Sequence, residues 1–175
     1  MVMKRFLLGG LLLSASVGTA MAQSTVDMSF VGPKGLEQAA GTVKIEQTEY
    51  GALLTPSLKG LPPGIHGFHV HANPSCAVGD VDGKPTPAGA AGGHWDPDKT
   101  GAHKGPYDAS GHKGDLPALY VDAKGEAHYP VLAPRLKASD ISGHALMVHA
   151  GGDNHSDHPE KLGGGGARIV CGVAK

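Results

Sequence analysis

Short runs in which apolar and polar residues alternate recur along this chain, and they constrain its fold more than any other feature. Successive side chains of a β-strand point to opposite faces, so a period of two is typical of a half-buried strand. Helix signals are nearly absent, and 28 of the 175 residues are glycine. The pattern predicts an all-β protein, an antiparallel sandwich or barrel. The alternating runs cover residues 26–30, 43–45, 119–121, 127–131, 145–149 and 167–173.

The first residues are typical of a secretory signal peptide. Lys4 and Arg5 precede an apolar run that is too short to span a membrane, and Ala-Met-Ala at 20–22 resembles a signal-peptidase cleavage site. We expect residues 1–22 to be removed and residues 23–175 to form one domain. Loss of the leader changes the formal net charge from −1 to −3, since both lost charges are basic. There is no basic run and no row of aromatics for nucleic-acid binding.

The two cysteines, Cys76 and Cys171, lie far apart in the chain. In an exported protein such a pair most simply forms one disulfide, although two free thiols or a cysteine metal site are the alternatives. Two long segments lack sustained periodicity, residues 73–118 and 150–166. Loops of this length are either disordered or functional. The first contains Cys76 and three histidines, so a disulfide and a metal could order it.

The histidines are the main candidates for function. His69 and His71 flank one residue, so on a strand both imidazoles point to the same face and can bind one transition metal. With His149, from a later strand, they lack one ligand of the all-nitrogen set that Cu(II) favours. A second set, with three imidazoles and a carboxylate, suits a closed tetrahedral zinc site of structural type. That set is His94, His103, His112 and Asp115.

Four sequence motifs resemble those of the copper,zinc superoxide dismutase family, and the resemblance extends over essentially the whole of residues 23–175. The leader and the segment HAGGDN resemble the bacterial periplasmic branch of that family. The resemblance implies an eight-stranded antiparallel Greek-key β-barrel with two long functional loops. The motifs are HGFHVH at 66–71, GHWDP at 93–97, GHKGDL at 111–116 and GGGGARIVC at 163–171.

The resemblance also assigns roles to individual residues. It implies that His94 bridges the two metals, that Cys76 and Cys171 form the family's disulfide, and that Arg168 is the active-site arginine. Asp153 matches a carboxylate that links a copper ligand to a zinc ligand, here His69 and His103. His66 would support the barrel without binding metal, while His128, His144, His155 and His158 fit no ligand position and are expected on the surface. The implied copper ligands are His69, His71, His94 and His149, and the implied zinc ligands are His94, His103, His112 and Asp115.

The activity implied by the resemblance is dismutation of superoxide to oxygen and hydrogen peroxide in the periplasm, with one copper and one zinc per subunit. Arg168 would attract the anion and His94 would handle a proton. Monomers and homodimers both occur in this branch, so the sequence does not determine the oligomeric state. One alternative is a periplasmic copper-binding or delivery protein without turnover, but it needs neither Arg168 nor a zinc set. Another is a β-sandwich interaction domain with purely structural metals.

Overall fold

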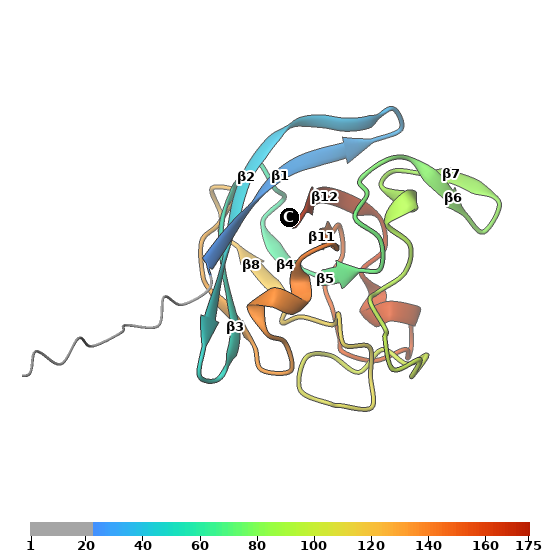
Figure 1. Ribbon diagram of the computed structural model, residues 1–175. Coiled ribbons are helices and arrows are strands. Elements are labelled where there is room, and N and C mark those ends of the chain that lie inside the picture. Colours follow the sequence, from blue (N-terminus) through green and yellow to red (C-terminus); the bar gives the residue numbers. More distant parts are fainter. Residues whose placement is uncertain (1–22) are drawn as a thin grey trace, which may run out of the picture.

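Antiparallel strand pairing organises the chain (Figure 1), and the computed structural model describes residues 23–175. The predicted leader therefore lies outside the described residues. Eight strands form the main sheet, in which β9 pairs with β3 beside the continuous path of the other seven. Along that path the order is β10 (Val131–Ala133), β3 (Gly51–Lys59), β2 (Gly35–Thr48), β1 (Gln23–Gly32), β12 (Arg168–Val173), β11 (Ala145–His149) and β5 (Phe68–His71), and β9 is Glu126–Ala127.

The remaining elements are short. Two further ladders join β4 (Gly64–His66) to β8 (Leu119–Val121) and β6 (Gly79–Val81) to β7 (Lys84–Thr86). The described part of the chain contains no α-helix, only short 3-10 helices. None of these is long and apolar enough to cross a membrane. The three 3-10 helices are η1 (Gly89–Ala91), η2 (Ala138–Ile141) and η3 (Lys161–Gly164).

The first strand of the main sheet pairs with the last, since Ser29 of β1 lies opposite Cys171 of β12. The ribbon in Figure 1 shows that the sheet curls, as in the Greek-key barrel that was predicted. It encloses an apolar core built from the inward side chains of alternating strand positions. Val43, Ile45 and Leu54 are fully buried examples. Burying each such side chain contributes about 1.5–3 kcal/mol.

The strands confirm most of the alternating runs, with two corrections. The run at 127–131 is not one strand but two, β9 and β10, because Pro130 has no N–H to donate to a ladder. The segment 73–118 is not wholly irregular either. Its hairpin β6–β7 turns at Asp82 and Gly83, which both have positive φ (52° and 76°), as a tight type I′ turn requires.

Candidate metal centre

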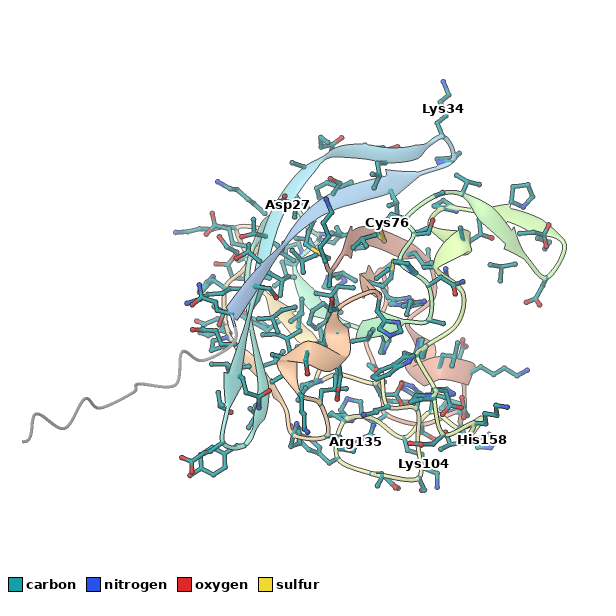
Figure 2. The ribbon with its side chains drawn as sticks, viewed as in Figure 1. Asp27, Lys34, Cys76, Lys104, Arg135 and His158 are labelled. Atoms are coloured by element: carbon teal, nitrogen blue, oxygen red, sulfur yellow. A yellow bond between two sulfur atoms is a disulfide. The ribbon has the colours of Figure 1, made fainter. Side chains whose placement is uncertain are left out.

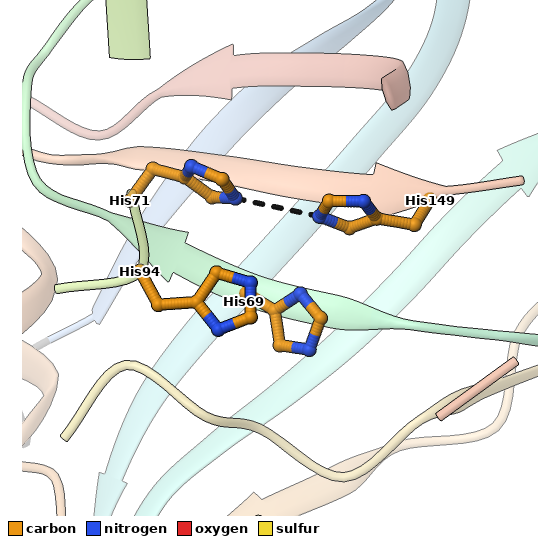
Figure 3. A group of neighbouring side chains, drawn as sticks. All are labelled: His69, His71, His94 and His149. Carbon is orange, nitrogen blue, oxygen red and sulfur yellow. Dashed lines mark hydrogen bonds between the residues drawn. The ribbon is translucent and has the colours of Figure 1, made fainter. Parts of the chain in front are cut away.

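Two neighbouring strands and one loop hold the first group of ligands. His69 and His71 lie in β5, whose other two side chains, Phe68 and Val70, join the apolar core. The alternation of the strand therefore puts both imidazoles on the face opposite the core, as predicted. His149 ends β11, which pairs with β5, and His94 reaches β5 through an isolated bridge to His71. One ligand atom from each of the four histidines lies within 4.8 Å of all the others (Figure 3).

The second group lies in the loop that follows β7. One oxygen of Asp115, Oδ1, is 2.9 Å from His94 Nδ1, 3.0 Å from His103 Nδ1 and 3.4 Å from His112 Nδ1. Candidate ligand atoms of these four residues also lie within 4.8 Å of one another. His94 is therefore a member of both groups, with one ring nitrogen available to each.

The hydrogen bonds of His71 and His149 leave lone pairs that a cation would satisfy. In each ring Nδ1 faces a backbone carbonyl, that of Gly92 for His71 (2.9 Å) and that of Gly166 for His149 (3.2 Å). A carbonyl only accepts, so Nδ1 carries the proton of each neutral ring. The two Nε2 atoms, 3.4 Å apart and joined by the dashed line in Figure 3, are then both acceptors. Such a contact is unfavourable without a positive charge between them.

Other buried nitrogens face the same two centres with few or no partners. His69 Nδ1 and His94 Nε2 have no hydrogen-bond partner in the first group, and in the second group His103 Nδ1 and His112 Nδ1 have no polar neighbour other than the shared oxygen of Asp115. Buried polar atoms are almost always paired, so these nitrogens indicate a missing ligand. The donor sets fit the two metals: four nitrogens suit copper, and three nitrogens with one carboxylate suit zinc.

Asp153 connects the two groups through the ring nitrogens that do not face the metal positions. Its side chain is fully buried, with Oδ2 2.8 Å from His69 Nε2 and Oδ1 2.7 Å from His103 Nε2. This carboxylate holds each ring so that the unpaired Nδ1 points inward. Gly163 leaves room for it, because a side chain at that position would overlap the Asp153 carboxylate. The nearby Asp157 instead accepts backbone N–H groups, from His103 at 2.8 Å and Leu162 at 3.0 Å.

Burial and charge set the protonation of the ligands. Burial, followed by repulsion from His94, holds the pKa of His69 and of His71 well below the usual value. Burial also lowers the pKa of His149 to about 4, so these rings are neutral at pH 7 and can act as ligands. Burial works against ionisation of Asp115 too, but hydrogen bonds from the surrounding imidazoles prevail and hold its pKa below the usual range.

Arg168 begins β12 and lies opposite His149 in the sheet. Its guanidinium is half-buried and donates to the carbonyl oxygens of Ala88 (2.6 Å) and Gly92 (2.7 Å). Burial lowers the pKa of Arg168, but the group stays charged because an arginine pKa lies far above neutral pH. A fixed positive charge therefore lies beside the first group of ligands.

A disulfide joins Cys76 to Cys171, as predicted, and the two cysteines are 95 positions apart in sequence. It ties the start of the long loop to the last strand and packs in a small cluster with Ala88, Ala91 and Met147. The loop that carries His94 is thereby held against the strand that carries Arg168.

The remaining histidines divide into three kinds. His66 is buried and both of its ring nitrogens lie beside carbonyl oxygens, those of His149 (2.7 Å) and Pro62 (2.8 Å), in agreement with a supporting role in the barrel. His128 and His158 are exposed, as expected. The surface prediction holds only in part for His144 and His155, which are partly buried, because the ring of His144 packs against that of Trp95 in a tilted arrangement and that of His155 packs against Gly105. None of these four belongs to the two groups.

Together, the curled antiparallel sheet and the two ligand groups that share one histidine define a β-barrel protein with a two-metal centre. Residues 39–174 match the family described as copper/zinc superoxide dismutase (SODC). The chain belongs to this family.

Similar proteins agree with that assignment. Superoxide dismutase [Cu-Zn] 1 of Salmonella typhimurium is 56% identical over 170 residues, which cover 95% of this chain and 94% of the relative. Superoxide dismutase [Cu-Zn] of Escherichia coli K12 is 52% identical over 174 residues, with 99% and 100% coverage. The structure of a Cu/Zn superoxide dismutase from Brucella abortus superposes with a TM-score of 0.85 at 50% identity, covering 88% of this chain and all of the other.

Proposed function

We propose that the two ligand groups hold copper and zinc and that this centre carries the superoxide dismutase activity of the family. The copper ligands would be His69, His71, His94 and His149, and the zinc ligands His94, His103, His112 and Asp115. The observation that carries the proposal is that His94 offers a nitrogen to each group. When bound, copper supplies one-electron redox chemistry and zinc supplies charge without redox chemistry. In the reaction, two superoxide anions and two protons become one oxygen and one hydrogen peroxide.

The protein side chains perform two tasks in this reaction. Arg168 attracts the superoxide anion and orients it, because its guanidinium carries a permanent charge and several donors. His94 Nε2 accepts a proton in one half-reaction and donates it to the developing peroxide in the other, as a general acid. Because the net charge of the chain is negative, attraction of the anion must be local to Arg168.

The cellular setting is part of the same proposal. Residues 1–22 would be a signal peptide, and residues 23–175 the mature domain in the periplasm, with one copper and one zinc per chain. The Gram-negative relatives support this placement. Fractionation of cells that produce the full chain tests it, since a cytoplasmic, uncleaved product would contradict it. A homodimer is possible for this chain, as is a monomer, and a related structure is described as that of a monomeric enzyme from Salmonella enterica. Sedimentation velocity of the mature chain distinguishes the two states.

The decisive experiment measures superoxide dismutation by the mature chain in metal-free, zinc-only and copper-plus-zinc forms, with bound metal counted in each. Activity only in the copper-plus-zinc form, at about one copper and one zinc per chain, is the expected result. Stoichiometric copper binding without turnover would contradict the proposal and favour a copper-delivery protein.

A further inference from the structure

Arg135 belongs to neither ligand group, yet it contacts the loop that supplies the zinc-binding group. It lies two positions after β10, at the same end of the molecule as Lys104 (Figure 2). Its guanidinium is partly buried and donates only to backbone carbonyls of this loop. Nε donates to Pro106 (2.9 Å), Nη1 to Gly111 (3.3 Å), and Nη2 to Gly105 (3.0 Å) and His112 (2.6 Å).

Two of these contacts lead directly to the carboxylate ligand. Gly105, whose carbonyl accepts from Arg135, donates its own N–H to Asp115 Oδ2 at 3.3 Å. His112, whose carbonyl also accepts from Arg135, accepts the backbone N–H of Asp115 at 3.3 Å. Gly105 and His112 therefore each form a hydrogen bond with Arg135 and another with Asp115, so a single residue links the guanidinium to the carboxylate ligand in both cases.

The loop has little regular structure of its own, whereas the backbone on both sides of Arg135 is held by hydrogen bonds to strand β3. No strand or helix lies between η1 and β8 in the described chain, so the segment 103–115 depends on isolated contacts. Beside Arg135, the β10 residue Ala133 pairs with Ala52, and Leu136 accepts the N–H of Ala52 at 2.8 Å. The planar arginine fork is rigid and can satisfy several acceptors at once.

We propose that Arg135 is a positioning residue for zinc: it holds the loop so that His112 and Asp115 converge with the other ligands before the metal binds. This inference rests on the proposed function of the zinc group. Loss of a partner that orients metal ligands typically costs about 10–100-fold in metal affinity. We expect a loss of that size when the guanidinium is removed.

The test compares Arg135→Gln and Arg135→Lys with the control Lys137→Gln in the mature chain. Lys137 is exposed and lies in the same segment, its hydrogen bond is to Asp140, and its replacement by Gln removes the same charge. Zinc affinity is measured by competition with a chromophoric chelator, and the visible spectrum of Co²⁺ reports the geometry of the same ligands. We expect Arg135→Gln to bind zinc about 10–100-fold more weakly, with an altered cobalt spectrum, and Lys137→Gln to match the wild type.

Arg135→Lys separates positioning from charge and from general stability. The lysine side chain keeps the positive charge, but all of its N–H donors are on one nitrogen. It therefore cannot donate to four separated carbonyl groups at once. We expect this variant to fold and still to bind zinc more weakly than the wild type. Wild-type zinc affinity and an unchanged cobalt spectrum in either Arg135 variant would overturn the inference. If the wild type itself bound no zinc, the proposed function would fail instead.

Discussion

The side chains of His71 and Arg168 donate hydrogen bonds to the same atom, the carbonyl oxygen of Gly92, at 2.9 Å and 2.7 Å. One peptide group therefore fixes a proposed copper ligand and the proposed anion guide relative to each other. Gly92 has a positive φ of 75°, and a side chain there would come within 3.1 Å of Asn73. Glycine at this position thus permits the turn that presents the carbonyl to both donors.

Replacing Arg168 should slow capture of the substrate while leaving the metals in place. We expect Arg168→Ala to lower kcat/KM about tenfold or more and to weaken its dependence on ionic strength, since a local positive field raises on-rates by roughly 10–10³. Lys34→Ala is the matched control, because Lys34 is exposed at the tip of the β1–β2 hairpin (Figure 2) and loses the same charge. Steady-state kinetics at several salt concentrations, with metal analysis, provide the check. Equal kinetics in both variants would argue against the role of Arg168.

Asp153→Asn should weaken both metal groups at once. An amide has only one oxygen, so its nitrogen would face the N–H of His69 or of His103 and could not accept it. We expect copper and zinc affinities to fall, each by about 10–100-fold. Competition titrations of the two metals measure this, with the exposed loop residue Asp98 changed to Asn as the control. A loss confined to one metal would mean that Asp153 does not act as a link.

Cys76→Ser should destabilise the protein under oxidising conditions. A disulfide that closes 95 residues restricts the unfolded chain, which contributes about 4–5 kcal/mol in the chain-entropy model. Urea unfolding of the wild type and the variant, with and without a reducing agent, measures the difference. The two proteins should become similar once the wild type is reduced, and an equal midpoint without reductant would contradict the expectation.

Removal of the metals should give a stability that is highest near pH 6.5. The histidines with lowered pKa values, such as His69 and His149, bind protons more readily when unfolded, so stability falls as the pH drops from about 6.5 towards 4. His103 behaves in the opposite way. Burial lowers its pKa, but hydrogen bonds to Asp115 and Asp153 prevail and raise it to about 9, so its contribution is complete below about pH 6.5 and is lost as the pH rises through 9. Urea unfolding of chelator-treated protein at pH 4.5, 6.5 and 8.5 provides the measurement, and a flat profile would disagree.

Local patterns in the sequence were enough for the strands and for part of the centre. Alternation predicted β1, β11 and β12, and the same period of two placed His69 and His71 on one face. It did not reveal β3, because Leu53 puts an apolar residue on the outward face as well and Pro56 is unusual inside a strand. The grouping of the other ligands rested on spacing together with the resemblance to a known family.

Contacts between distant segments could not be read from the sequence. Asp153 and Asp157 lie in one loop and look alike there, yet one faces two imidazoles and the other accepts backbone N–H groups. Arg135 gave no signal at all, because its partners are 23 to 30 positions away and are backbone atoms, which have no sequence signature.

The pairing of β1 with β12 has a consequence for biogenesis. Because the first strand of the barrel needs the final one as its neighbour, the sheet cannot close while the end of the chain is still being synthesised. Contacts of such long sequence separation are slow to form. The proposed metal ligands extend from His69 to His149, and Arg168 and Cys171 follow later still. Assembly of the metal centre is therefore a late event, completed only after the whole polypeptide has been synthesised.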